Sequence, residues 1–113
     1  MQVTIYHNPR CTKSRQTLAR LQDKGIEPKV VEYLKEPLDE KTLKQLLKKL
    51  GLKAEQLIRK KDHKALGLPQ PTSETEWISQ MAANPKIIER PIVVVGSQAR
   101  LGRPPESVDE ILG

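Results

Sequence analysis

The sequence predicts an α/β fold built on a mixed sheet, in the order strand, helix, strand, several helices, hairpin, helix. Three observations carry this prediction: an apolar and polar alternation near the N-terminus, a leucine repeat at helical spacing in the middle, and a β-branched run followed by a glycine turn near the C-terminus. The chain has 113 residues, of which 36% are hydrophobic. This length is typical of one domain, so we expect a single folded unit.

The N-terminal segment predicts a strand, a helix and a second strand. Apolar and polar residues alternate over 2–6, and one apolar face runs through 12–24 before Gly25. Residues 29–33 include Val30, Val31 and Tyr33, which favour a strand. Such a unit normally pairs its strands in parallel through a right-handed crossover. The loop that carries Cys11 would then lie at the carboxyl end of the first strand, where open α/β sheets bind ligands.

The middle of the chain predicts charged, amphipathic helices. Four leucines recur at the i, i+3, i+4 and i+7 spacing of one buried stripe, namely Leu43, Leu46, Leu47 and Leu50. Gly51 ends this helix, and a shorter one is expected over 54–58. Ser73 and Glu76 form a capping-box pattern for a third helix, which closes at Asn84 and Pro85.

The C-terminal segment predicts an antiparallel hairpin and a last short helix. Residues 92–95 are all β-branched, and Gly96 with Ser97 is a two-residue turn of the Gly-first kind before the chain returns over 98–101. Proline is favoured in the first turn of a helix, so the pair at 104–105 can open the final helix.

Composition excludes several classes of function. The net charge of +6 favours anionic partners. There are only three aromatic residues, and this argues against a base-stacking surface for nucleic acid. Because Cys11 is the one cysteine, no internal disulfide and no cysteine-rich zinc site can form, so we expect no metal. No secretory core and no run of ~18 apolar residues is found, and we expect a cytoplasmic protein without a membrane segment.

Cys11 is the candidate for chemistry because it stands where a strand gives way to a helix. Backbone N–H groups at a helix start favour a thiolate and can also hold an oxyanion. Ser14 lies one turn further on and could donate a hydrogen bond to the sulfur. His7 could pair with the thiolate or bond within the turn, and the sequence leaves both open, as it does the chance that Cys11 is an inert buried residue.

Competing cysteine motifs are absent. A tyrosine-phosphatase-like loop needs arginine six residues after the cysteine, where Thr17 stands, and a dithiol motif needs a second cysteine at Ser14. The thiol that resolves a Cys11 adduct must therefore come from another molecule. From spacing alone, Arg59, Arg90 and Arg103 are expected to be solvated surface charges. His63 is expected on a solvated helix face.

Several motifs together resemble the glutaredoxin-coupled arsenate reductase family. They are His7-Asn8-Pro9-Arg10-Cys11-x-x-Ser14-Arg15, Leu57-Ile58-Arg59, Asn84-Pro85-Lys86, Glu89-Arg90-Pro91-Ile92-Val93 and Gly102-Arg103-Pro104-Pro105. The resemblance spans nearly the whole chain. It implies a single domain over 1–113 with a thioredoxin-like core at about 1–35 and 86–113, and an inserted helical segment at about 36–85. It also implies a cis peptide bond before Pro91.

The resemblance further implies reduction of arsenate to arsenite by a monomer that uses glutathione as co-substrate and glutaredoxin as partner, with no tightly bound cofactor. Cys11 would be the nucleophile, and Arg59, Arg90 and Arg103 would bind the oxyanion. The residues expected to support them are His7, Asn8, Ser14, Arg15 and Pro91.

Two other functions fit a chain of this kind. One is a redox-responsive transcriptional regulator of the Spx type, which binds RNA polymerase; Ser14 in place of a second cysteine argues against it. The other is a glutathione-dependent thiol transferase without an oxyanion substrate. In that case replacing Arg59 or Arg90 by alanine would leave activity intact.

Overall fold

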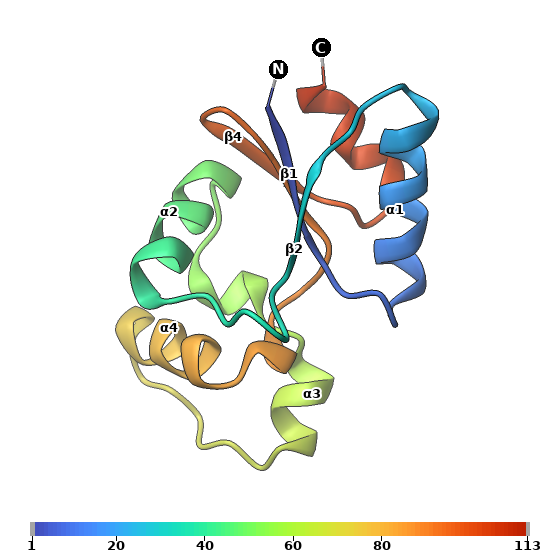
Figure 1. Cartoon of the computed structure of the whole chain (residues 1–113). Coiled ribbons are helices and arrows are strands. Elements are labelled where there is room, and N and C mark those ends of the chain that lie inside the picture. Colours follow the sequence, from blue (N-terminus) through green and yellow to red (C-terminus); the bar gives the residue numbers. More distant parts are fainter. Residues whose placement is uncertain (1, 113) are drawn as a thin grey trace. The chain divides into compact units, whose positions relative to one another are not determined.

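The computed structural model describes residues 2–112, which form two compact units (Figure 1). The first unit combines the N-terminal residues up to Glu36 with the segment from Arg90 onward, and the second is Pro37–Glu89. The second unit reaches a few residues beyond the expected insertion of about 36–85. Ile88 forms an isolated β-bridge with Ile58, and this pairing keeps residues 86–89 with the helical segment.

The first unit contains a four-stranded mixed sheet. Its strands are β1 (Val3–His7), β2 (Lys29–Glu32), β3 (Ile92–Val95) and β4 (Gln98–Leu101), in the spatial order β2-β1-β3-β4. β1 pairs in parallel with β2 through α1 (Thr12–Asp23), and antiparallel with β3. The predicted strand-helix-strand unit and the predicted hairpin are both confirmed.

The hairpin turn has the geometry that its sequence predicts. Val95 is the partner of Gln98, which leaves Gly96 and Ser97 as the two turn residues. Gly96 has a φ of 60°, whereas no non-glycine residue of the described chain has a positive φ. A positive φ at the first turn position alone is typical of a type II′ turn, which suits the twist of the two strands.

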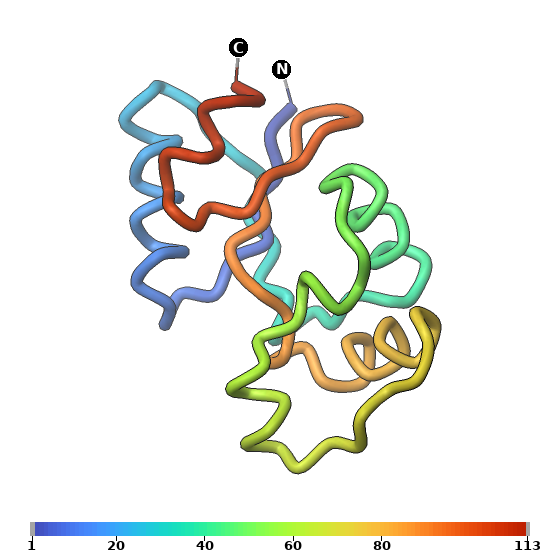
Figure 2. Tube along the Cα trace, turned by 180° about the vertical axis from the view of Figure 1, so that it is seen from behind, coloured from blue at the N-terminus to red at the C-terminus, as the bar shows by residue number. Residues whose placement is uncertain are grey.

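One face of this sheet is covered by α1 and by the C-terminal segment, which run beside each other in Figures 1 and 2. The buried apolar side chains between them are Val3, Ile5, Leu21, Val93, Val108 and Ile111. The C-terminal segment forms the 3-10 helix η3 (Pro105–Ile111) where an ordinary helix was expected. Val108 and Ile111, three residues apart, still share one face because a 3-10 helix repeats every three residues.

The second unit is helical. It contains α2 (Glu40–Leu50), η1 (Ala54–Leu57), α3 (Lys60–Ala65), α4 (Glu74–Ala83) and η2 (Pro85–Ile87). Asp39 caps α2 by accepting a 2.7 Å hydrogen bond from the Thr42 amide, and Gly51 ends the helix with a φ of 70°. α2 packs on α4, and three of the four stripe leucines are buried there, as the helical spacing predicts.

Two details of this unit differ from the sequence prediction. Ser73 Oγ accepts a hydrogen bond from the Glu76 amide, but the Glu76 carboxylate bonds to Thr72 in place of the Ser73 amide, so only half of the capping box forms. His63 was expected on a solvated face, and this is wrong. His63 is 7% exposed, because this face of α3 packs against α4: its Nε2 lies 2.8 Å from Gln80 Oε1, and its ring centroid lies 5.1 Å from that of Trp77.

Across residues 2–112, no helix combines the length and the apolar character that a membrane span requires.

Candidate functional site

The site begins where β1 ends. His7 is the last residue of the strand, and the next residues form a tight turn in which the Cys11 amide donates to the Asn8 carbonyl at 3.0 Å. The Asn8 side chain closes the turn, since its Oδ1 accepts from the Arg10 amide at 3.0 Å. Cys11 then occupies the N-cap of α1 with extended backbone angles, φ −91° and ψ 124°. The sulfur therefore lies at the start of a helix, at the carboxyl edge of the sheet.

The surroundings of Cys11 favour its thiolate. Burial raises the pKa of the thiol, but hydrogen bonds from the Ser14 amide, the Arg90 guanidinium and the Lys13 amide, together with the Arg90 charge, outweigh it and hold the pKa below its ordinary value. Both amides belong to the first turn of α1, so the start of the helix stabilises the ionised sulfur. Cys11 is only partly buried, and an incoming reactant can reach it.

Ser14 acts on the sulfur differently from the sequence expectation. Its hydroxyl is fully buried, lies 2.6 Å from His7 Nδ1 and accepts a 3.0 Å hydrogen bond from the Asn8 amide. When the His7 ring carries its proton on Nε2, the Ser14 hydroxyl donates to Nδ1. It is the Ser14 backbone amide, and not the hydroxyl, that stabilises the thiolate.

His7 bonds within the turn, which was one of the two alternatives that its position allowed. Burial lowers the pKa of His7, the charge of Glu32 opposes that effect, and Arg15 adds to it. A neutral ring with Nδ1 as acceptor matches the hydroxyl proton of Ser14. His7, Ser14 and Asn8 thus form one buried network that fixes the Cys11 turn.

Arg90 and Arg103 come from the other end of the chain to the same unit as Cys11. The Arg90 side chain is 8% exposed and bonds to the sulfur, and Arg103 is exposed and donates from Nη1 to the Arg90 carbonyl at 3.2 Å. The bond before Pro91 is cis, as expected, and a second cis bond precedes Pro104. Arg90 therefore contacts the sulfur, and Arg103 contacts the Arg90 backbone; oxyanion binding by either arginine stays a prediction.

Arg59 lies in the second unit. Its Nε is 3.0 Å from Asp62 Oδ2 and 3.6 Å from Glu89 Oε1, and its amide donates to the Ile87 carbonyl at 2.7 Å. Acidic groups of its own unit thus orient the guanidinium. Its role in oxyanion binding stays a prediction.

Arg15 supports the turn that carries Cys11. Its guanidinium donates to the Pro9 carbonyl at 2.9 Å and to Thr12 Oγ1 at 3.3 Å, and both contacts hold the turn that precedes the helix. Within residues 2–112 there is no cluster of three or more histidine, cysteine or acidic side chains that could bind a metal ion.

Sequence reasoning missed Gly102 and Thr17 as part of the site's framework. The Gly102 amide donates to the Pro91 carbonyl at 2.9 Å, and Thr17 Oγ1 lies 3.4 Å from the Gly102 carbonyl. The chain passes so close to α1 here that a side chain at Gly102 would overlap Thr17 and Pro91. No local pattern indicates this approach, because it joins segments that are distant in the sequence.

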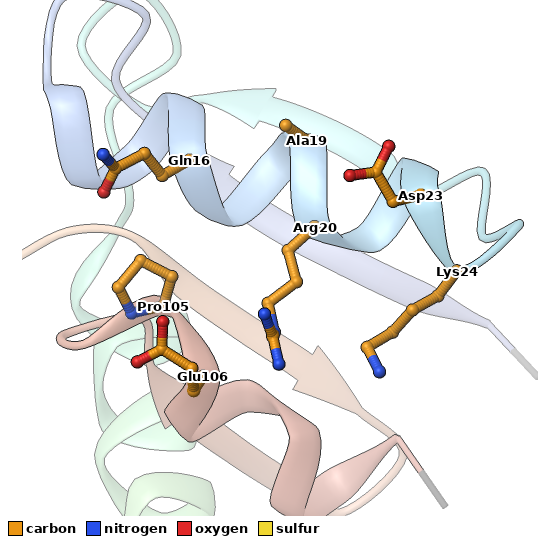
Figure 3. Close-up of a pocket in the computed structure, with 7 residues that line it drawn as sticks. All are labelled: Gln16, Ala19, Arg20, Asp23, Lys24, Pro105 and Glu106. Carbon is orange, nitrogen blue, oxygen red and sulfur yellow. The ribbon is translucent and has the colours of Figure 1, made fainter.

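A wider groove of about 540 Å³ lies elsewhere in the first unit, between α1 and the start of η3 (Figure 3). Arg20 extends across it, and both Arg20 and Lys24 pair with Asp109. Asp109 therefore already pairs with both cations of the groove, and Cys11 does not line the groove. The groove does not have the character of an oxyanion site.

Comparison with known proteins gives a consistent result. The family model described as ArsC family matches residues 6–111. The chain is 53% identical over 116 residues to a protein of Escherichia coli K12 named Uncharacterized protein YfgD, covering 99% of this chain and 98% of that one. It is 45% identical to the arsenate reductase of Haemophilus influenzae, with 99% and 100% covered. The solved structure of the arsenate reductase from Vibrio cholerae superposes with a TM-score of 0.89 at 47% identity, with 99% and 98% covered.

Proposed function

Because this chain belongs to the ArsC family and has its thioredoxin-like fold, we propose that it is an oxidoreductase that reduces arsenate to arsenite through Cys11. The single observation that carries the proposal is the environment of the sulfur. Two backbone amides and the buried Arg90 guanidinium lower the pKa of Cys11, which makes the sulfur a nucleophile. The same guanidinium places a positive charge beside it. Arsenate is a tetrahedral anion, which such a site attracts.

The proposed reaction starts with attack of the Cys11 thiolate on arsenic. A sulfur–arsenic bond forms and an oxygen of arsenate leaves as water after protonation. Glutathione then adds, and a disulfide forms between its sulfur and that of Cys11, while the two electrons pass to arsenic and arsenite leaves. Glutaredoxin resolves the Cys11–glutathione disulfide by thiol exchange. An external thiol is required because Cys11 is the one cysteine of the chain.

The arginines would stabilise the negative charge on the arsenate oxygens as the sulfur attacks. Guanidinium groups are suited to this because they present paired donors to tetrahedral oxyanions. Arg90 and Arg103 fill this role in the first unit, and Arg59 is proposed as the third donor. His7, Asn8, Ser14, Arg15 and Pro91 keep the turn and the neighbouring backbone in place.

The setting of the reaction follows from the same thiol chemistry. A free, ionised cysteine is preserved in a reducing compartment, so we place the protein in the cytoplasm. It would act as a monomer, with arsenate as substrate, glutathione as co-substrate and glutaredoxin as partner, and without a tightly bound cofactor.

The test is arsenate-dependent oxidation of NADPH in the presence of glutathione, glutathione reductase and glutaredoxin. Cys11→Ser should abolish the turnover that depends on this protein, and equal rates for the two proteins would remove Cys11 from the mechanism. Arg103→Ala, at an exposed position, should lower the rate by ~10²-fold without unfolding the chain, since loss of one preorganised donor costs about that much. Full activity of Arg103→Ala would favour a thiol transferase without an oxyanion substrate.

A further inference from the structure

A second pocket lies beside the Cys11 turn. It encloses about 220 Å³ and is lined by Asn8, Pro9 and Arg10 from the turn and by Glu32, Leu34 and Lys35 from the end of β2 onward. β1 and β2 are parallel with His7 opposite Glu32, so both loops leave the sheet at the same edge. We propose that this pocket is the binding site for glutathione, the thiol that reacts at Cys11. The inference rests on the proposed function only in taking glutathione as the reductant.

The charges of the pocket complement those of glutathione. Arg10 and Lys35 are exposed cations, and Glu32 supplies one carboxylate. Glutathione at neutral pH carries a carboxylate at its glycine end and a carboxylate with an ammonium group at its γ-glutamyl end, so the end that enters the pocket meets opposite charges. Lys35 Nζ is 3.6 Å from Glu32 Oε1, and an exposed pair of this kind contributes little, so a ligand carboxylate can replace it at small cost. Arg10 can bind a carboxylate through two parallel hydrogen bonds.

The shape of the pocket fits one end of a tripeptide. Ligand pockets that enclose a whole drug-sized molecule measure roughly 300 Å³ or more, and this one is smaller. One carboxylate arm would occupy it, against Pro9 and a Leu34 side chain that is 40% exposed. The cysteinyl part is then left outside, near Cys11, which follows Arg10 directly and bonds through its amide to the Asn8 carbonyl.

The test uses a reaction that needs no arsenate. The Cys11 thiolate attacks glutathione disulfide, a Cys11–glutathione disulfide forms, and the second glutathione leaves as its thiolate. Bis(2-hydroxyethyl) disulfide undergoes the same exchange but has no charge. The ratio of the two rate constants measures recognition of glutathione separately from the reactivity of the sulfur.

Arg10→Gln and Lys35→Gln should each lower this ratio about fivefold, since an exposed charge pair is worth about 1 kcal/mol at most. The matched control is Lys29→Gln, which removes the same charge from the exposed start of β2 and should leave the ratio unchanged. An unchanged ratio in both pocket variants, or an equal fall in the control, would overturn the proposal. All three side chains are exposed, and thermal melts check that the variants fold.

The outcome is separable from that of the proposed function. If the ratio falls in the pocket variants while the wild-type protein does not reduce arsenate, the glutathione site is supported and the proposed arsenate reduction is refuted. If arsenate is reduced with glutathione but neither the ratio nor the KM for glutathione changes in the variants, the glutathione site is refuted and the proposed function is not. Variants that slow only the reduction by glutaredoxin would assign this surface to that protein and would also overturn the proposal.

Discussion

Gly102→Ala tests the close packing that supports the site. A Cβ atom at this position would lie 2.7 Å from Pro91 Cγ and 3.0 Å from Thr17 Cγ2, and closer still to Thr17 Oγ1. Neither neighbour yields easily. Pro91 is a ring, and Thr17 is β-branched with its hydroxyl donating to the Lys13 carbonyl at 2.8 Å. The added methyl group must therefore push α1 and the Pro91 segment apart.

The expected cost is large for a single methyl group. Overpacking a close-packed interior costs about 1–3 kcal/mol, and two rigid neighbours below ordinary contact distance put Gly102→Ala at the upper end. A loss of about 3 kcal/mol corresponds to a fall in Tm of roughly 10–20 °C for a chain of this size. Because the Gly102 amide also holds the Pro91 carbonyl, Cys11 should react more slowly as well.

The measurement is urea unfolding and thermal melting of Gly102→Ala beside Gly51→Ala. Gly51 has a φ of 70° and open space around it, so its variant carries only the backbone cost of about 1 kcal/mol. Repeating Gly102→Ala in a Thr17→Ala background should recover about 1 kcal/mol, because two of the three close contacts are then gone. A Tm within about 2 °C of wild type, or a loss no greater than that of Gly51→Ala, would refute the packing argument.

Three further predictions address the thiol, the surface charges and the core. Arg90→Gln should move the midpoint of Cys11 alkylation by iodoacetamide to higher pH, because the guanidinium lowers the pKa of the thiol; an unchanged midpoint contradicts this. Arg20 lowers the pKa of Asp109, so this pair stabilises the fold at neutral pH and the stability is lost as the pH falls through the lowered pKa. Asp109→Asn should therefore be less stable than wild type at about pH 7, and the difference should shrink toward about pH 3; a constant difference argues against the pair. Leu21→Ala, at a fully buried core position, should lose about 2–5 kcal/mol in urea unfolding, and a smaller loss would mean that the core closes around the gap.

The order of the elements could be predicted from the sequence because each depends on a local pattern. The alternation at β1, the leucine stripe of α2 and the glycine turn between β3 and β4 report backbone period and turn geometry directly. The place of Cys11 at the start of α1 follows from the break after His7 in the same way. Local patterns did not distinguish an α-helix from a 3-10 helix at the C-terminus, where η3 buries Pro105, Val108 and Ile111.

What tertiary structure alone decided is which distant groups meet. The sequence determined a short helical α/β chain with one nucleophilic cysteine at a helix start, and a resemblance suggested the arginines. Folding brought Arg90 to the sulfur, directed the Ser14 hydroxyl to His7, buried His63 against Trp77 and set Gly102 against Thr17. These contacts depend on strand register and on packing between segments that are far apart in the chain. Residue spacing reports the period of the local backbone. It does not report which segment, distant in the sequence, packs against that backbone.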